Sequence, residues 1–596
     1  YAGESETCPF AEELASRNSY NIQYDWVEVS EDIKGLGETS SNISEKIKVA
    51  FFYRPAQHDD PKIDQTPILF LNGGPGMDSH HMMMEMVKRD ELKNIPLVFM
   101  DQRGTGCSSS YPRLNSETIQ RSLNWGSRAI VEDAEAIRYK LFKDRKWKLF
   151  GHSYGGLVAF RYIANHGDSL VNATVYGYSL TKDPIDWLYN QTLFIEDQSL
   201  AYLEEYPGDR ELIKSVRELI HSDTCLSVKD YQICGDAIID SLGEYLAFQD
   251  YWVQIHTTLE NLKKFWGTRF EEQQMASLAR LIFGQLAASD GNIVQNAISN
   301  FEIVPGYTPH QAYAEVEKRM IKNNVSVENW LFNPVYYMKH LKLGSRSSLF
   351  KNLPNDELSI DEVYRGLRNH PEIMVNLFSG SRDGIMPPTN YLEFVHKIDA
   401  YTKYEEIPYV SHNDYLQERI IEELAKSTQF DFEKCISLNN IKAISLIKGE
   451  FLPWIGENTE YDVDKLGEQL PKVCTLSQKE INYAATGVYN PSGPSINAFY
   501  LLNSHESNGI ILLNKNIDWD SLRAIDQLIH EVIHFVQYKN GMFPKYSCQN
   551  ESEKEAYLLG GTYMRSIGVD AFSDPFPNRS YWANIYSRCE FEGFMD

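Results

Sequence analysis

The serine at the centre of "LFGHSYGGLVAF", residues 149–160, is set in a pattern that suits nucleophilic catalysis. Residues 151–155 read G-x-S-x-G, between an apolar run typical of a strand and an apolar run typical of a helix. A sharp strand-to-helix turn strains its central residue and needs glycines beside it, and it presents the serine oxygen near backbone N–H groups. The pattern therefore predicts Ser153 as a nucleophile on such a turn.

A serine nucleophile on this kind of turn needs an acid and a histidine later in the chain, in that order. Asp383 follows the strand-like run in "EIMVNLFSGSRDGIMPP", and His412 follows the one in "YEEIPYVSHNDYL". His412 would take the proton of Ser153, and Asp383 would fix the histidine tautomer and stabilise the imidazolium. Asp414 lies close to His412 but after the expected acid position, so we expect it to be an N-cap.

A second pattern, H-E-x-x-H, lies in "DQLIHEVIHFVQY", residues 526–538. On a helix, positions i and i+4 share a face, so His530 and His534 can both reach one zinc ion. Glu531 lies beside that face and is placed to act as the general base of a metallopeptidase. The alternatives are two histidines that only cap a core helix, or a zinc site that is structural. The glutamate within the motif favours a catalytic site.

A catalytic zinc needs a third protein ligand. The helix-like stretch "NESEKEAYLLGG", residues 550–561, supplies Glu551, Glu553 and Glu555. The stretch resembles the ligand helix of zincin-like peptidases, many of which carry an E-x-x-A pattern there. Glu553 with Ala556 fits that pattern, so the resemblance implies Glu553 as the ligand, with Glu555 as second choice. Before the motif, "NAFYLLNSHESNGIILLN" gives two strand-like runs across a turn, and we expect its His505 to be a turn residue.

The elements that must position these residues fall into an α/β pattern. From about residue 45, strand-like runs such as "KIKVAFFYRP" and "TPILFLNGG" alternate with helix-like runs, which predicts a parallel sheet. Ligands of such sheets gather at the carboxyl ends of the strands. We therefore expect an α/β core, first part, at 1–182, a helical cap insertion at 183–365, the second part of the core at 366–435, and a smaller α+β domain at 436–596.

Four stretches of the N-terminal part resemble the proline iminopeptidase family of α/β-hydrolases, which also contains tripeptidyl aminopeptidases. They are "NGGPG" at 72–76, "DQRGTGCS" at 101–108, "VEDAEAIRYKL" at 131–141 and "GHSYGG" at 151–156. The resemblance implies an α/β-hydrolase fold with a helical cap, and an exopeptidase acting on free peptide N-termini. The C-terminal part resembles a zincin fold broadly rather than one family.

The family resemblance also implies roles for individual residues. Gly74 and Tyr154 would supply the oxyanion N–H groups. Asn72 stands where iminopeptidases usually carry His, which favours the tripeptidyl branch over strict proline specificity. Cap carboxylates bind the substrate ammonium group in this family, and the candidates here are Glu196, Glu204 and Glu205.

Composition limits the remaining possibilities. The chain has 57 Lys and Arg against 83 Asp and Glu, which argues against nucleic acid or an anionic membrane as main partner. No apolar run approaches the roughly 20 residues of a membrane-spanning helix.

The cysteines bear on localisation. None of the eight lies in a C-x-x-C motif, and their even number favours an exported protein with disulfides. Cys225 and Cys234 are close enough to bridge a local loop, and Cys548 with Cys589 is a second possible pair. The start at Tyr1 fits a mature secreted or periplasmic protein.

Together these patterns predict a bifunctional peptidase. A serine aminopeptidase with a helical cap would be followed by a zinc-dependent metallopeptidase, with zinc as cofactor and peptides or proteins as substrates. The alternative is a serine esterase or amidase whose C-terminal domain is a catalytically silent binding module.

Overall fold

The computed structural model divides the chain into two compact units. The first unit comprises Tyr1–Val363, Val375–Lys397 and Lys403–Lys426, and the second comprises Ser427–Asp596 with the short segments Tyr364–Met374 and Ile398–Thr402. The structure describes residues 8–16, 20–32, 45–57, 65–115, 118–228, 231–289, 293–341, 353–370, 373–426, 438–464, 466, 469–476, 481, 498–503, 506–518, 521–546 and 549–569.

The first unit is built on an eight-stranded sheet with the order β1-β2-β4-β3-β5-β6-β9-β10. β3 pairs in parallel with β4 and β5, and β5 pairs in parallel with β6, while β1–β2 and β2–β4 are antiparallel. The sheet is thus mostly parallel, as predicted. Its strands are β1 Gln23–Ser30, β2 Lys46–Arg54, β3 Ile68–Leu71, β4 Leu97–Met100, β5 Trp147–His152, β6 Leu170–Tyr176, β9 Met374–Gly380 and β10 Thr402–Ile407.

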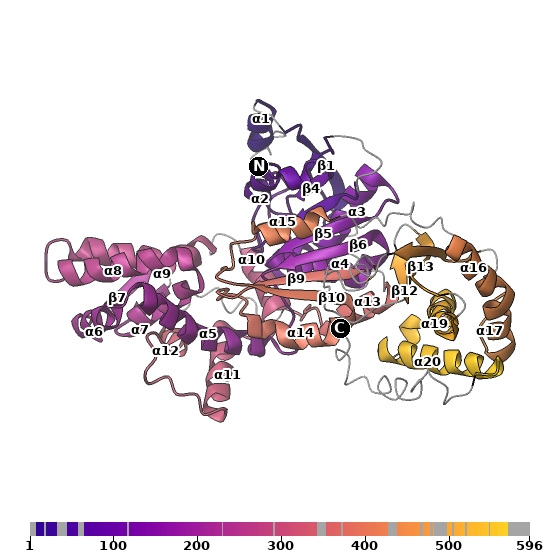
Figure 1. Ribbon diagram of the computed structural model, residues 1–596. Coiled ribbons are helices and arrows are strands. Elements are labelled where there is room, and N and C mark those ends of the chain that lie inside the picture. The colour runs from indigo at the N-terminus through magenta and orange to yellow at the C-terminus, as the bar shows by residue number, and fades with distance from the viewer. Residues whose placement is uncertain are drawn as a thin grey trace. The chain divides into compact units, whose positions relative to one another are not determined.

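Burial explains why these segments are strands. Every side chain of β3, β4 and β5 is buried, which matches their short continuous apolar runs and places them in the middle of the sheet. Figure 1 shows helices lying against this sheet. The helices of the core are α1 Pro9–Ser16, α2 His80–Met86, α3 Ser127–Phe142, α4 Tyr154–His166, α14 Leu392–Ile398 and α15 Glu418–Ala425, while most of α13, Ile360–Asn369, belongs to the second unit.

A buried ion pair ties the loop after β4 to α3. Arg103 Nε donates to Asp133 at 2.7 Å, and a terminal nitrogen donates to the other carboxylate oxygen at 2.6 Å. Both side chains are almost fully buried, and such paired, bidentate geometry is what a buried charge requires. The arginine of the "DQRGTGCS" stretch therefore positions the loop.

The insertion after β6, here called the cap, is mainly helical and lies within the first unit. Asp183 caps α5 by accepting a hydrogen bond from the backbone of Ile185. The helices are α5 Pro184–Glu205, α6 Asp209–Leu219, α7 Ala237–Asp240, α8 Trp252–Phe265, α9 Glu271–Ser289, α10 Ile293–Ile298, the π-helical turn Ser299–Ile303, α11 Pro309–Lys322 and α12 Pro334–His340. Helices α6 to α9 gather to one side of the sheet in Figure 1.

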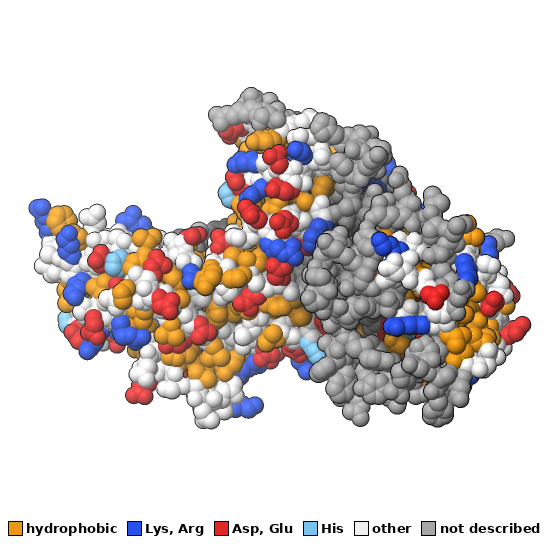
Figure 2. Space-filling view, in the orientation of Figure 1, with side chains coloured by type: hydrophobic (Ala, Val, Ile, Leu, Met, Phe, Trp, Pro, Cys, Tyr) orange, Lys and Arg blue, Asp and Glu red, His pale blue; other side chains and the backbone are white. Residues whose placement is uncertain are grey.

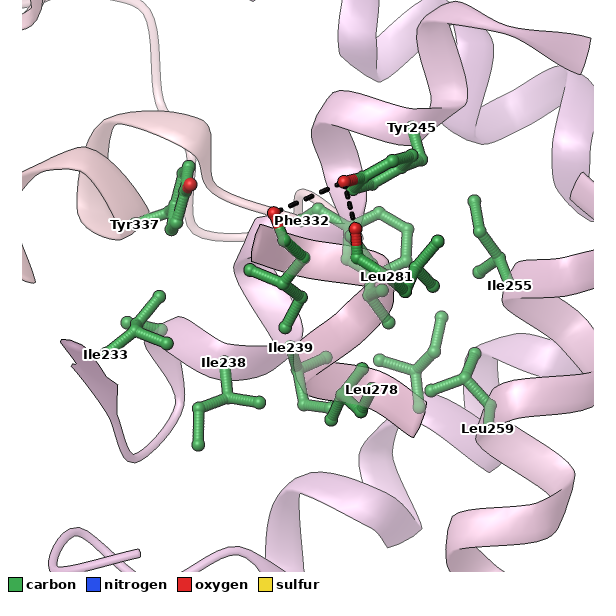
Figure 3. Close-up of a cluster of buried hydrophobic side chains, with 14 of the residues drawn as sticks. Ile233, Ile238, Ile239, Tyr245, Ile255, Leu259, Leu278, Leu281, Phe332 and Tyr337 are labelled. Atoms are coloured by element: carbon green, nitrogen blue, oxygen red, sulfur yellow. Dashed lines mark hydrogen bonds between the residues drawn. The ribbon is translucent and has the colours of Figure 1, made fainter. Parts of the chain in front are cut away.

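The cap has its own hydrophobic core (Figure 3). Isoleucines of the β8–α7 segment pack against leucines of α8 and α9, and the hydroxyl of Tyr245 donates to the backbone carbonyl of Leu281. A buried tyrosine oxygen of this kind needs such a partner. The cap is therefore a packed layer and not a loose loop.

A small hairpin that the sequence does not predict also belongs to the cap. β7, Cys225–Val228, pairs antiparallel with β8, Tyr231–Cys234, so that Cys225 faces Cys234. The predicted disulfide between these two cysteines is confirmed. A second disulfide joins Cys8 to Cys107, and Cys474 is also disulfide-bonded. The predicted Cys548–Cys589 pair lies outside the described residues.

The second unit is a smaller α+β body. β11 Lys472–Leu476 pairs in parallel with β13 Glu506–Asn514, and β12 Ala498–Asn503 pairs antiparallel with β13, giving the order β11-β13-β12. The helices are α16 Leu438–Leu446, the π-helical turn Ile447–Phe451, α17 Leu452–Asn458, α19 Leu522–Lys539 and α20 Gln549–Ser566. His505 lies outside the described residues.

The middle of α19 is buried on all sides, from Leu528 to Gln537, which explains its apolar character around the two histidines. Its aliphatic side chains join β11, β12 and β13 in one hydrophobic core. Ser521 caps the helix by accepting from the backbone of Ala524.

Charged side chains of both signs share the visible surface of the first unit (Figure 2). On the face of the first unit shown in Figure 2, Lys and Arg side chains lie among Asp and Glu side chains rather than in one continuous basic area. Within the described part of the chain, no helix combines the length and apolar character that crossing a membrane requires.

Candidate functional site

Ser153 lies on the sharp turn between β5 and α4. Its backbone adopts φ 53° and ψ −125°, a conformation that residues with a side chain rarely take. The neighbouring glycines are required by close approach: a Cβ on Gly151 would lie 2.5 Å from the carbonyl oxygen of Gly155, and one on Gly155 would lie 2.1 Å from that of Leu71. The turn thus presents Ser153 at the N-terminus of α4.

The structure brings Ser153, His412 and Asp383 together. His412 Nε2 lies 2.9 Å from Ser153 Oγ, and His412 Nδ1 lies 2.9 and 3.0 Å from the two carboxylate oxygens of Asp383. Asp383 is fully buried and also accepts hydrogen bonds from the backbones of Ile385 and Met386 at 3.0 and 2.8 Å. In this geometry the histidine can take the serine proton while the aspartate stabilises the resulting charge.

Buried side chains fix the loop that carries His412. His152 Nε2 lies 2.9 Å from the carbonyl oxygen of His412, and the hydroxyl of Tyr176 donates to the carbonyl of Ser411. Burial lowers the pKa of His152 to about 3, so the ring is neutral and Nε2 donates. Asp414 accepts from the backbone and hydroxyl of Ser411, both at 2.8 Å. It therefore closes this turn, whereas the sequence predicts a helix N-cap.

The residues predicted to form the oxyanion hole line one cavity with the serine. Gly74 and Tyr154 both belong to the wall that contains Ser153 and His412. Tyr154 is the first residue of α4, where backbone N–H groups lack helical partners and favour negative charge. Asn72 organises the loop before Gly74, because its side chain accepts from the backbone of Gly73 at 2.9 Å and donates to the carbonyl of Asp78.

This cavity of about 150 Å³ is mainly apolar, and none of the described residues that line it is Lys or Arg. Two carboxylates, Glu302 and Glu357, stand in its wall. The full lining is Gly74, Ser153, Tyr154, Gly177, Tyr178, Ser179, Leu180, Thr181, Pro184, Trp187, Glu302, Ile303, Glu357, Leu358, Ile385, Met386 and His412.

Glu302 is held firmly beside the nucleophile. It accepts hydrogen bonds from the hydroxyl of Tyr154 at 2.6 Å and from the backbone and hydroxyl of Ser127 at 2.8 Å each. Burial raises the pKa of Glu302 above its ordinary value, although Arg161 opposes this effect. The residue comes from the π-helical turn of the cap, so cap and core meet at the serine.

The cap carboxylates chosen from the sequence lie elsewhere. Glu196, Glu204 and Glu205 are all in α5 and none of them lines the cavity. Sequence reasoning missed Glu302 and Glu357. The only signal for Glu302 is a single acid between apolar residues in "NFEIVPGY", and a helical cap gives no strand order from which to place it.

In the second unit, His530, His534 and Glu553 converge. The two Nε2 atoms lie 3.2 Å apart, and each lies 3.2 Å from a different carboxylate oxygen of Glu553. Zinc takes nitrogen and oxygen ligands at about 2.0–2.1 Å, and the edge of a tetrahedron of that size is about 3.3 Å. The three groups therefore fit a zinc ion in ligand type and in spacing.

Only one of the three candidate glutamates of α20 lies with the two histidines. Glu553 is in the converging set, while Glu551 and Glu555 are not. Residues two apart on a helix project about 200° apart, so neighbouring candidates cannot all reach one ion. Although burial works against protonation of His534, the Glu553 carboxylate raises its pKa to about 9.

Glu531 is buried between α19 and β12. One of its oxygens accepts a hydrogen bond from the backbone N–H of Tyr500 at 2.7 Å. Burial raises the pKa of Glu531 above its ordinary value, and the nearby histidines oppose this. The carboxylate is thus oriented by the edge strand of the sheet.

Comparisons with known proteins bear on the N-terminal part. A family model for the alpha/beta hydrolase fold matches residues 66–191. Proline iminopeptidase of Arabidopsis thaliana is 30% identical over 147 residues, which is 24% of this chain and 36% of the relative. The same enzyme of Thermoplasma volcanium is 30% identical over 129 residues, 22% of this chain and 39% of the relative.

The matches are partial. The chain spans little more than a third of the length of these curated relatives. The crystal structure of proline iminopeptidase from Mycobacterium smegmatis has 13% identity and a TM-score of 0.34 to the chain, covering 67% of this chain and 96% of that one. The family model confirms the predicted α/β-hydrolase fold. The zincin-like character of the second unit stays a prediction.

Proposed function

From an α/β-hydrolase fold with proline iminopeptidase-like relatives over its N-terminal part, we propose that the first unit is a serine aminopeptidase. It removes one or a few residues from the free N-terminus of peptides. The observation that carries the proposal is the pairing of His412 with both Ser153 and Asp383 beside a cavity that has carboxylates and no cation in its described wall.

The chemistry follows from the positions of the side chains. Ser153 Oγ attacks the peptide carbonyl carbon as His412 Nε2 takes its proton, and the backbone N–H groups of Gly74 and Tyr154 stabilise the oxygen anion. His412 then passes the proton to the leaving amine, which breaks the peptide bond and leaves an ester on Ser153. Water, deprotonated by the same histidine, hydrolyses the ester and restores the serine.

Glu302 and Glu357 account for an N-terminal preference. A protonated substrate amine in the cavity would meet two carboxylates, and charge-assisted hydrogen bonds of this kind contribute about 1.5–3 kcal/mol. A blocked N-terminus would leave both carboxylates without that partner. The mainly apolar remainder of the wall, including Trp187 and Met386, favours apolar side chains next to the cleaved bond.

The test is a comparison of aminoacyl and tripeptidyl arylamides with their N-acetylated forms and with short-chain esters. An aminopeptidase prefers the free amines, and Ser153→Ala loses all of these activities. If blocked amides and esters are cleaved as well as free amines, the unit is an esterase or amidase and the proposal fails.

We propose a second activity for the second unit, a zinc-dependent peptidase. His530, His534 and Glu553 would hold the ion, and their mutual 3.2 Å spacing supports this. A zinc ion held there supplies Lewis-acid polarisation of a peptide carbonyl. Glu531, on the same helix and oriented by Tyr500, is placed to take a proton from water as general base.

Elemental mass spectrometry of the full chain tests the metal centre. We expect one zinc per chain in the wild type and none in His534→Ala, while a fluorophosphonate still labels Ser153 in both. A wild type without zinc would overturn the metallopeptidase proposal and would favour a silent binding module in the second unit.

The disulfides Cys8–Cys107 and Cys225–Cys234 support export to an oxidising compartment, secreted or periplasmic. Thiol titration of the native protein after denaturation without reductant should find these four cysteines unreactive. Reactive thiols at these positions in protein isolated from its own source would contradict export.

A further inference from the structure

One of the two histidines of the proposed zinc centre has a buried amide partner. His534 Nδ1 lies 2.9 Å from Gln537 Oε1, one turn further along α19. Gln537 is fully buried, so its amide cannot be satisfied by solvent and every hydrogen bond it makes is a fixed part of the core. The inference below rests on the proposed zinc centre and deepens it.

The orientation of this amide follows from its other contacts. Gln537 Nε2 donates to the carbonyl oxygen of Ser552 at 3.1 Å and to a carboxylate oxygen of Glu555 at 2.9 Å. A backbone carbonyl accepts only, and so does an ionised carboxylate, so the amide nitrogen must face them. The amide oxygen therefore faces His534, and His534 Nδ1 must carry a proton. In the neutral ring that a metal ligand must be, this Nδ1 proton leaves Nε2 with the free lone pair that a metal ion requires.

Glu555 is itself held from two sides. The hydroxyl of Tyr461 donates to it at 2.7 Å, and the hydroxyl of Tyr546 donates to the same oxygen. Tyr461 follows α17 and Tyr546 precedes α20, so two loops and two helices meet at one carboxylate. This leaves Glu555 no role as a ligand, although it stands only two positions after Glu553.

The second histidine differs. His530 Nδ1 is buried and has no hydrogen-bond partner among the described residues, so no side chain there sets its tautomer. Among the described residues, hydrogen-bonded support thus reaches His534 Nδ1 and not His530 Nδ1.

We propose that Gln537 and Glu555 form a relay that holds His534 in its metal-binding tautomer, so that Glu555 governs zinc affinity without contacting the ion. Both are positioning residues. The division between Glu553 as ligand and Glu555 as support explains why the stretch "NESEKEAYLL" carries several acids.

The test measures zinc affinity of the full chain by competition with a chromophoric chelator. Loss of a hydrogen-bond partner of a metal ligand typically lowers metal affinity about 10–100-fold. We expect Gln537→Leu to lower zinc affinity by an amount in this range. Gln537→Glu places a carboxylate opposite the Glu555 carboxylate, and we expect it to lower zinc affinity by at least about tenfold.

The swapped pair Gln537→Glu/Glu555→Gln gives a matched rescue. A carboxylate at 537 still accepts from His534, and an amide at 555 can donate to it and accept from the tyrosines, although the carbonyl of Ser552 loses its donor. We expect the double variant to bind zinc more tightly than Gln537→Glu alone, a recovery that a purely structural role would not produce. The control is Glu450→Gln, since Glu450 also accepts from a tyrosine of this unit, Tyr563, but lies outside the relay.

A second readout is the visible absorption spectrum of the cobalt(II)-loaded chain, which reports ligand geometry at saturation. It should change in Gln537→Leu and return in the swapped pair. Wild type that binds zinc, with equal affinities and spectra in all variants, would overturn the relay alone. Wild type that binds no zinc would overturn the metal centre and the relay with it.

Discussion

The two candidate sites are assembled in opposite ways. In the first unit, Ser153, Asp383 and His412 come from three strand ends far apart in the sequence, and only the sheet brings His412 within 3.0 Å of both Ser153 and Asp383. In the second unit, one turn of α19 supplies both histidines, and the next long helix supplies the carboxylate. The first site depends on tertiary topology, and the second depends on helix periodicity. Each therefore has different points at which it can be broken.

The largest effect should separate the two sites completely. Ser153→Ala should lower arylamide hydrolysis by at least about 10⁴-fold, because the nucleophile is lost while the cavity remains. Zinc content should stay at the wild-type level. Ser277→Ala, an exposed serine of α9, is the matched control and should keep full activity. Residual aminopeptidase activity in Ser153→Ala, removed by a zinc chelator, would show that the cleavage belongs to the second unit.

Next, Glu553→Ala should lower zinc affinity by at least about 100-fold, more than loss of a supporting residue such as Gln537. Fluorophosphonate labelling of Ser153 should not change. Chelator competition on both variants, with fluorophosphonate labelling of the same samples, shows which residue contributes more to zinc affinity. Equal losses in Glu553→Ala and Gln537→Leu would contradict the division between ligand and support.

Acidification should lower the stability of the first unit because of His152. Burial lowers its pKa to about 3 from an ordinary 6.5. As the pH falls below 6.5, His152 becomes protonated in the unfolded chain but stays neutral in the native unit. The free energy of unfolding therefore decreases on acidification, by about 2 kcal/mol at pH 5.

Urea titrations read by hydrogen exchange of peptides from β5 would measure this at pH 7 and pH 5. His152→Gln should lessen the pH dependence even if it lowers stability at both values, whereas the same change at exposed His340 should not. An unchanged slope in His152→Gln would contradict the assignment.

The smallest effect concerns substrate choice. Glu357→Gln should raise KM for free-amine arylamides about tenfold, the size expected for one lost charge-assisted contact, and leave esters unaffected. Glu204→Gln, an exposed change in α5, is the control. If Glu204→Gln raised KM for free-amine arylamides tenfold and Glu357→Gln did not change it, the substrate amine would bind near Glu204 and not near Glu357.

The same contrast explains what the sequence could predict. The strand-to-helix turn at Ser153, the chain order of Asp383 and His412, and the spacing of His530 and His534 can be predicted from local sequence patterns. In the structure, Ser153 lies on that turn close to His412, and His530 and His534 lie close together on α19. Their catalytic and metal-binding roles stay predictions. Glu302, Glu357 and Gln537 could not be found in that way. Their roles depend on which side chains a packed cap or helix pair brings against them, and neither periodicity nor strand order carries that information. The Cys8–Cys107 disulfide depends on tertiary contact in the same manner.

The backbone at Ser153 has a further consequence for how this chain can change over time. A residue with a side chain held at φ 53° destabilises the folded state by about 1–3 kcal/mol, and glycine would relieve most of that. A population selected only for thermal endurance would drift toward glycine at this position and lose the nucleophile. Serine at this position therefore provides the nucleophile at a cost in folding stability.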